Sequence, residues 1–224
     1  MEIISGKIVD AGPGYLLIRA PYSNTERMIR REYEEVEIGL KDGRKITPEQ
    51  RRKAYALMGE ISEWAGYEPE EMKEVLKHEF LKKVVRSLQR ELFSLSNCDV
   101  TMAREFISYL VDFILRNDVP THQPLGQLAD DIDRYVYACL IHKKCAVCGL
   151  KAELHHVDQI GLGGDRTEAE HIGRRCLPLC RKHHDELHQM GGQSFLDYHH
   201  LKPGVIDERI ARIYKLKGGA KRAS

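Results

Sequence analysis

Apolar residues change their spacing part-way along the chain, from short runs to helical repeats. In the first part, short apolar runs flank a Gly-Pro-Gly turn at residues 12–14, and Val36, Ile38 and Leu40 alternate with polar residues. Alternation with a period of two is typical of a half-buried strand. The pattern therefore predicts two or three short strands in residues 1–44.

The helical part opens with explicit start and stop signals. Thr47 can cap a helix, Pro48 suits its first position, and Gln50 completes a capping box. Gly66 ends the run of apolar positions at helical spacing. We expect the apolar stripe between these signals to be ordinary core.

Three further helices follow by the same criteria. Pro69 opens the second, and the third is capped by Thr101 and ends at Asn117, just before Pro120. The fourth is expected as one helix with an apolar stripe, in which Cys139 is a small buried hydrophobe. This stripe consists of Leu125, Leu128, Ile132, Val136 and Cys139.

Charge and metal-binding residue types are divided unequally along the chain. Residues 1–140 carry 20 basic and 24 acidic side chains, a net of −4, whereas residues 141–224 carry 15 and 10, a net of +5. Nine of the eleven histidines and four of the six cysteines lie at or after His142. A basic, ligand-rich segment suits a polyanionic partner.

The cellular compartment of the protein also determines whether its cysteines are expected to bind metal or to form disulfides. No apolar run approaches the roughly 20 residues that span a bilayer, and the first residues lack a basic leader and an apolar core. We therefore expect a cytoplasmic protein with no membrane partner. In a reducing compartment, metal binding is favoured over disulfides.

Two ligand pairs with matched gaps predict a structural zinc site. Cys145 and Cys148 form the first pair, and Cys180 and His183 form the second, 32 residues after Cys148 (180 − 148). Together they provide the Cys₃His set of one tetrahedral zinc, which can supply on the order of 10 kcal/mol of folding free energy. The alternative is that these thiols are free and buried.

Further histidines predict a second, imidazole-only site. His184 and His188 are four residues apart, so a helix places them on one face, and His155-His156 follows the apolar Leu154. A site with three histidine ligands keeps open positions for water and substrate, as a catalytic metal requires.

The sequence CAVCGLKAELHHVDQIGLGGDR, with RRCLPLCRKHHDELH after it, resembles the HNH, or His-Me finger, endonucleases. The resemblance implies a ββα-metal unit with His155, His184 and His188 as metal ligands and His156 as general base. It also places residues 161–164 in the loop before the helix. Mg²⁺ or Mn²⁺ is the expected catalytic ion, with Zn²⁺ and Ni²⁺ as alternatives, because three imidazoles bind many first-row ions.

These residue types suit phosphodiester hydrolysis. A neutral imidazole has an ordinary pKa near 6.5 and can accept a proton from water at neutral pH, while a metal neutralises charge on the phosphate. Adjacent strand residues point to opposite sides, so one histidine of the pair can bind metal while the other faces the water. Six basic residues around the cluster could contact the DNA backbone: Lys143, Lys144, Arg166, Arg174, Arg181 and Lys182.

One position departs from the HNH pattern. The middle Asn would lie nine residues before His184, and Arg175 occupies that place. An Arg has five donors and a long reach, so our hypothesis is that Arg175 takes over the support that the Asn gives to the loop. The role of the nearby His171 stays open.

Two segments of the helical region read ITPEQRRKAYALMGEISEWAGYEPEEMKEVLKHEFL and FSLSNCDVTMAREFISYLVDFILRNDVP. With these segments, residues 45–120 resemble the lambda Orf, or NinB, family of phage recombination mediators. The resemblance implies binding to single-stranded or branched DNA and contact with a host single-strand-binding protein.

The predicted fold class is α+β. The expected parts are a small β element (1–44), a helical region (45–140), a zinc-stabilised HNH finger (141–200), and a C-terminal helix with a basic tail (201–224). The predicted function is a metal-dependent DNA endonuclease of phage recombination or replication. The alternatives are a DNA-binding recombination mediator with a silent HNH site, favoured by the absent Asn, and a homing nuclease, which lacks a visible DNA-reading appendage.

Overall fold

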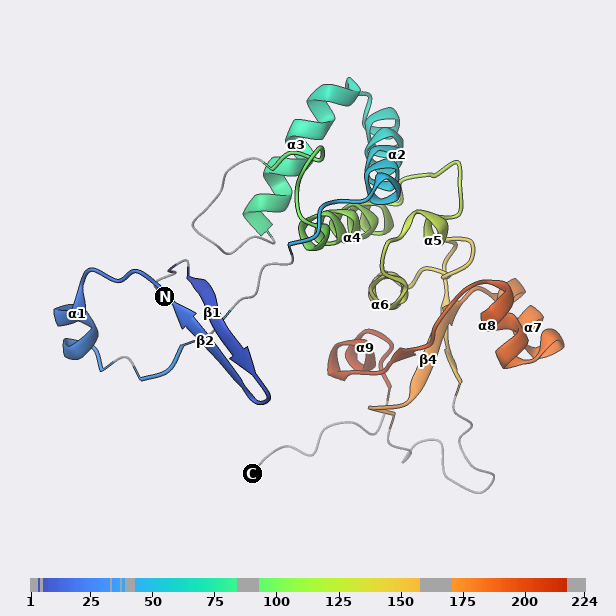
Figure 1. The fold of residues 1–224 in the computed structure, drawn as a ribbon. Coiled ribbons are helices and arrows are strands. Elements are labelled where there is room, and N and C mark those ends of the chain that lie inside the picture. The colour runs from blue at the N-terminus through green and yellow to red at the C-terminus, as the bar shows by residue number, and fades with distance from the viewer. Residues whose placement is uncertain are drawn as a thin grey trace.

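The fold is described from a computed structural model of residues 1–224. The structure describes residues 4, 6–32, 34–36, 38, 43–83, 93–157 and 171–216. The Gly-rich loop at residues 161–164, Arg166 and the tail after residue 216 lie outside them. The chain is a mixture of α and β structure in which helices predominate and the sheets are small (Figure 1).

The N-terminal part is a two-stranded hairpin followed by a short helix. Strands β1 (Lys7–Gly12) and β2 (Tyr15–Arg19) pair antiparallel across the predicted turn, where Gly14 has a φ of +83°. Helix α1 (Thr25–Arg30) comes next, and the Asn24 side chain accepts a hydrogen bond from its first turn.

The third strand expected at Val36 and Ile38 is absent from the described residues. Both side chains are exposed, by 80% and 55%, and neither residue belongs to a strand. The lower count of two strands is therefore the one found among the described residues. Val36 and Ile38 depart from the expected half-buried strand because such a strand needs a pairing partner, and in the described part β1 and β2 pair with each other. Leu40, the last residue of the pattern, is not described.

Helix α2 (Pro48–Ala65) confirms its predicted boundaries. Both hydrogen bonds of the capping box are present between Thr47 and Gln50. Gly66 caps the other end in the left-handed region, at a φ of +71°. Helix α3 (Pro69–Lys83) opens at the predicted proline.

Helix α4 (Val100–Asn117) ends where expected but begins two residues earlier than predicted. Its N-cap is Asp99, because the carboxylate accepts a hydrogen bond from the Met102 N–H at 2.7 Å. Thr101, the predicted cap, therefore lies inside the first turn. An Asp at this place also suits the positive end of the helix dipole.

The predicted fourth helix is two helices, α5 (Leu125–Leu128) and α6 (Ile132–His142). The extended backbone of Ala129 ends α5, and the Asp131 carboxylate then caps α6 by accepting from two N–H groups of its first turn. The apolar stripe is continuous in sequence, but these local hydrogen bonds interrupt the helix. Cys139 is fully buried, as predicted.

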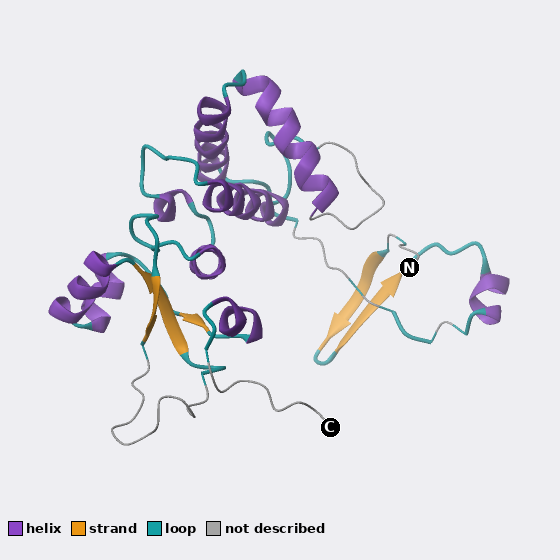
Figure 2. Cartoon of the chain, turned by 180° about the vertical axis from the view of Figure 1, so that it is seen from behind, coloured by secondary structure: helices purple, strands orange, loops and turns teal. Residues whose placement is uncertain are grey.

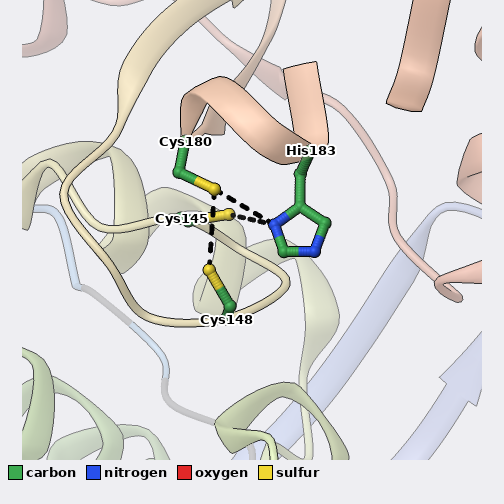
Figure 3. A group of neighbouring side chains, drawn as sticks. All are labelled: Cys145, Cys148, Cys180 and His183. Carbon is green, nitrogen blue, oxygen red and sulfur yellow. Dashed lines mark hydrogen bonds between the residues drawn. The ribbon is translucent and has the colours of Figure 1, made fainter. Parts of the chain in front are cut away.

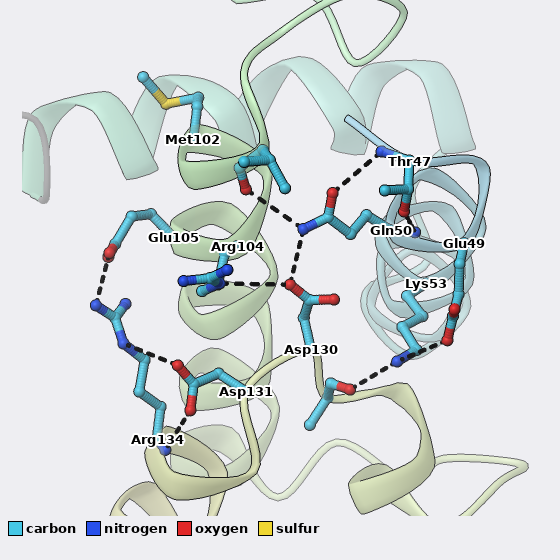
Figure 4. A network of polar contacts seen from close by, with 12 residues as sticks. Thr47, Glu49, Gln50, Lys53, Met102, Arg104, Glu105, Asp130, Asp131 and Arg134 are labelled. Atoms are coloured by element: carbon cyan, nitrogen blue, oxygen red, sulfur yellow. Dashed lines mark hydrogen bonds and ion pairs between the residues drawn. The ribbon is translucent and has the colours of Figure 1, made fainter. Parts of the chain in front are cut away.

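A polar network joins the start of α6 to α2 and α4 (Figure 4). The Gln50 amide donates to the Val100 carbonyl and to the Asp130 carboxylate at 2.8 Å. Arg134 of α6 forms an ion pair with Glu105 of α4 at 2.7 Å. These bonds connect three helices at the point where the chain turns toward its C-terminal part.

The C-terminal part is a three-stranded antiparallel sheet with helices on both sides. Its strand order is β3 (Glu153–His156), β4 (Arg175–Leu179), β5 (Gly204–Val205). Helices α7 (Arg181–Met190) and α8 (Gly192–Tyr198) lie on one side of the sheet and α9 (Glu208–Ile213) on the other (Figures 1 and 2).

Helix α6 packs against this sheet as well as against α4. The two approach closely at Gly204, where an added Cβ would come within 2.8 Å of the Leu140 side chain. One core of buried residues therefore continues from α2 and α4 through α6 into β4 and α9. Among the residues that the structure describes, none of the helices has the length and apolarity needed to cross a membrane.

Candidate metal centre and catalytic pocket

The four predicted zinc ligands converge from a turn and from the start of a helix (Figure 3). Cys145 and Cys148 lie in a tight turn after α6, whereas Cys180 is the N-cap residue of α7 and His183 lies in that helix's first turn. His183 Nδ1 is 3.2 Å from Cys180 Sγ and 3.4 Å from Cys145 Sγ. The Cys148 and Cys180 sulfurs are 3.7 Å apart.

These separations suit a tetrahedral zinc ion. Zn–S bonds of about 2.3 Å at tetrahedral angles place two sulfurs about 3.8 Å apart. All four ligand atoms lie within 4.8 Å of one another. The set therefore fits zinc in both donor chemistry and spacing.

Ion binding by this cluster depends on pH, because its cysteines must lose their protons to bind a metal. Burial raises the pKa of Cys148 to about 12. Burial also opposes ionisation of Cys180, but the hydrogen bond from the His183 backbone N–H and those from neighbouring thiols outweigh it and lower the Cys180 pKa. Because metal ligands must be deprotonated, ion binding at this cluster would release protons.

A carboxylate lies behind the histidine ligand. Glu186 Oε2 is 3.8 Å from His183 Nε2, and Glu186 Oε1 is 3.2 Å from His199 Nε2. Such a partner orients the ring of a metal-binding histidine and fixes its tautomer. Burial also lowers the pKa of His183, which keeps its ring neutral and able to bind an ion through Nδ1.

Three more histidines meet between β3 and α7. His155 Nδ1 is 2.7 Å from His184 Nε2, which in turn is 3.3 Å from His188 Nε2. Two nitrogens bound at about 2.1 Å to one ion lie roughly 3 Å apart at right angles, so this group also fits a divalent ion. Burial, aided by the charges of the neighbouring histidines, lowers the pKa of His155 to about 4, and burial lowers that of His184.

His156 lies beside this group but contacts a different residue. Its Nε2 is 3.0 Å from Nδ1 of His171, which lies just before β4. His155, His156 and His188 all line one cavity of about 250 Å³ that reaches the α7–α8 junction. The structure thus brings a possible metal group and a possible base to the same cavity.

Arg175 is the first residue of β4, next to the strand that carries the histidine pair. Its backbone carbonyl accepts a hydrogen bond from the Val157 N–H at 2.9 Å, directly after His156. Its side chain is exposed. The backbone of Arg175 therefore holds the end of β3 in register.

Some of the predicted DNA-binding charges have acidic partners. Lys144 forms an ion pair with Asp118, and Arg181 Nε lies 3.3 Å from Asp185. Lys143 Nζ lies over the Tyr214 ring at 5.2 Å. The excess of basic residues in the sequence therefore overstates the positive charge that Lys144 and Arg181 would offer to DNA, whereas Lys143 keeps its charge over the ring.

His171, whose role the sequence left open, contacts a residue that lines the cavity. It is 7% exposed and contacts His156 across the end of the sheet. Its sequence signal is weak, because it is a single histidine before an Ile-Gly turn. Only the pairing of β3 with β4, which sets His156 opposite Cys176, shows that His171 reaches the histidine pair.

The chain is similar to one family of nucleases over most of its length and to one curated protein over a short segment. A family model described as "Putative HNHc nuclease" matches residues 22–217, which include the helical region and both clusters. Over 45 residues the chain is 51% identical to the uncharacterized protein YdfU of Escherichia coli (strain K12). That match covers 20% of this chain and 12% of the relative. No solved structure matches the chain.

Proposed function

This chain belongs to the HNHc nuclease family, and we propose that it is a metal-dependent endonuclease that hydrolyses phosphodiester bonds of DNA. The observation that carries the proposal is the shared cavity. His156 lines it together with His155 and His188, and these two form with His184 a group whose nitrogens have the spacing of metal ligands.

His156 is proposed as the general base that accepts a proton from the attacking water. A divalent ion bound by the three-histidine group would neutralise negative charge on the scissile phosphate and the leaving oxygen. Mg²⁺ and Mn²⁺ are the proposed ions, with Zn²⁺ and Ni²⁺ as alternatives that imidazole ligands bind more strongly.

The Cys₃His cluster is proposed to hold a structural zinc. Cys145, Cys148, Cys180 and His183 leave no coordination position for substrate on a four-coordinate ion. The ion would fix the start of α7, the helix that carries two ligands of the other group.

Arg175 is proposed to support the site in place of the Asn of the HNH pattern. Its carbonyl bond to Val157 holds the backbone after His156, and its exposed guanidinium can reach a DNA phosphate. A second candidate function, a DNA-binding mediator with a silent site, is favoured by this same substitution.

The biological setting is also part of the proposal. Residues 45–120 resemble phage recombination mediators, which supports single-stranded or branched DNA as substrate, a host single-strand-binding protein as partner, and action in the bacterial cytoplasm. A finger comprising residues 141–200 would then cut the DNA that residues 45–140 bind.

The test is cleavage of single-stranded, duplex and branched DNA with Mg²⁺, Mn²⁺ or neither. We compare the wild type with His156→Ala and with the matched control His78→Ala, which changes an exposed histidine on α3. His156→Ala should lose about 10²- to 10⁴-fold in rate while still binding DNA, and the control should not. Equal rates for the wild type and His156→Ala on every DNA and with every ion would exclude the nuclease and favour the mediator.

A further inference from the structure

A buried histidine outside the proposed metal groups contacts the proposed base. His171 Nδ1 lies 3.0 Å from His156 Nε2, and their ring centroids are 5.0 Å apart at an interplanar angle of 46°. This angle and distance suit an edge contact through one nitrogen of each ring. The contact joins the proposed base to a residue that the proposed metal groups do not use.

Backbone hydrogen bonds define the turn that begins at His171 and join it to the buried Ile206. Residues 171–174 form a turn in which the Arg174 N–H donates to the His171 carbonyl at 3.2 Å. Gly173, the third residue, has a φ of +85°, as a type II turn requires. The Gly173 N–H donates to the carbonyl of the buried Ile206, whose own N–H donates to the Arg174 carbonyl.

Hydrogen-bond chemistry allows only two arrangements of the pair. When both rings are neutral, one nitrogen must carry the shared proton and the other must accept it. If His171 donates, then the proton of His156 lies on Nδ1, and neither of its nitrogens is available as a base. If His156 Nε2–H donates, then Nδ1 of His156 carries the lone pair that can accept a proton.

We propose that His171 is a positioning residue that accepts the hydrogen bond from His156 Nε2–H and so holds His156 in the tautomer with an unprotonated Nδ1. This inference rests on the proposed function, in which His156 is the base. When His156 takes a proton from water it becomes an imidazolium, and its Nε2–H bond to His171 becomes charge-assisted and stronger. His171 therefore favours the transition state as well as the reactive tautomer, as the third member of a base-orienting group does elsewhere.

Two substitutions separate an acceptor from a space-filling role. His171→Leu keeps much of the volume but has no acceptor, whereas His171→Asn places Oδ1 two bonds beyond Cβ, as Nδ1 is in histidine. With full-length, zinc-loaded protein, His171→Leu should cut saturating DNA about 10- to 100-fold more slowly at unchanged DNA affinity, the usual loss for a supporting partner. His171→Asn should recover most of that rate.

The tautomer is measured separately, by long-range ¹H–¹⁵N spectra of the histidine rings, with His156→Ala used to assign the signals. Wild type should show His156 protonated at Nε2, and His171→Leu should show a mixture. An unchanged tautomer in His171→Leu, or an unchanged rate in an active protein, would overturn the proposal, as would failure of His171→Asn to recover the rate.

The failure of this proposal is distinguishable from that of the proposed function. If the wild type cuts no DNA, the nuclease proposal fails, and the tautomer measurement alone tests the role of His171. If His171→Leu does not fold, the wild-type tautomer and the rate of His171→Asn decide it.

Discussion

His183 and His184 are consecutive residues of α7, yet their rings belong to different clusters. His183 Nδ1 lies 3.2 Å from the Cys180 sulfur, whereas His184 Nε2 lies 2.7 Å from His155 Nδ1. Because successive helix residues are rotated by about 100°, the first turn of α7 faces both groups at once. We therefore expect an ion bound at one cluster to stabilise the geometry of the other as well.

The first prediction concerns loss of zinc. Cys148→Ser removes one of four ligands, so the protein should lose its single tightly bound zinc and, with it, the order of α7. Metal analysis after dialysis should give one zinc per chain for the wild type and none for the variant. Binding of Mn²⁺ to the three-histidine group should be lost as well, while far-UV circular dichroism keeps the signal of α2, α3 and α4.

Cys98→Ser is the matched control, because Cys98 lies in the helical region and outside both clusters. It should keep its zinc. Wild-type protein without zinc, or Cys148→Ser with unchanged Mn²⁺ binding, would contradict the coupling between the two groups.

The second prediction separates the two ions. His184→Ala should abolish DNA cleavage and binding of the second ion but leave the zinc in place, because the His184 ring contacts His155 and His188, whereas its bond to Cys180 is made by the backbone and survives the substitution. Zinc content, Mn²⁺ titration and cleavage are measured on the same preparation. Retention of full cleavage by His184→Ala would show that the three-histidine group is not the catalytic one.

Sequence signals predicted the elements whose hydrogen bonds are local. The capping box at Thr47, the Gly66 stop and the start of α3 at Pro69 depend only on neighbouring residues, and all three are confirmed. The prediction of one helix over residues 125–139 was wrong because the Asp131 cap competes with an apolar stripe that continues across it. Periodicity reports which residues are buried but not where the backbone breaks.

The part of the candidate site that lies on one helix was predictable, because the sequence gap between two helix residues determines whether their side chains are neighbours. Gaps of three and four residues on α7 placed Cys180 beside His183 and His184 beside His188, as the structure has them. The contact of His171 with His156 was not predictable. It depends on the register of β3 against β4, and the chain between those strands gives no spacing rule.

The third prediction concerns the contact between α6 and the sheet. Gly204→Ala would place a Cβ 2.8 Å from the Leu140 side chain, which is fully buried and has little room to move. Overpacking of this kind costs about 1–3 kcal/mol of unfolding free energy. Denaturant unfolding should show this loss.

A double-mutant cycle provides the control. Leu140→Ala alone should cost about 2–5 kcal/mol by leaving a cavity, and Gly204→Ala should then cost much less in that background. Purely additive losses would mean that the two side chains do not compete for space.

The fourth prediction concerns pH and the end of α2. Glu60 accepts hydrogen bonds from the His122 backbone N–H at 3.1 Å and from His122 Nδ1 at 2.8 Å. The bond from Nδ1 raises the pKa of His122 above its ordinary 6.5. Protonation therefore favours the folded state. The stabilisation is complete below about pH 6.5 and disappears as the pH rises through the raised pKa.

His122→Gln should lower the melting temperature slightly at pH 6 and have less effect at pH 8.5. The effect is small because the His122 side chain is exposed. His78→Gln, an exposed histidine on α3, is the control and should show no such trend. A difference between wild type and His122→Gln that grows with pH would contradict the sign of the shift.

The last prediction concerns Arg175, which stands where the HNH pattern has Asn. Its backbone carbonyl holds Val157, and that bond survives any side-chain substitution, so Arg175→Ala should keep the fold, the zinc and the second ion. If the guanidinium contacts the scissile phosphate, Arg175→Ala should slow cleavage about 10- to 100-fold, and Arg175→Lys should recover part of the rate through its charge but not the bidentate geometry. The matched control for loss of one positive charge is Arg212→Ala, at a position on α9.

Equal losses in Arg175→Ala and Arg212→Ala, both restored at low salt, would reduce the role of Arg175 to general attraction of DNA. Unchanged cleavage in Arg175→Ala would leave the support of the base to His171.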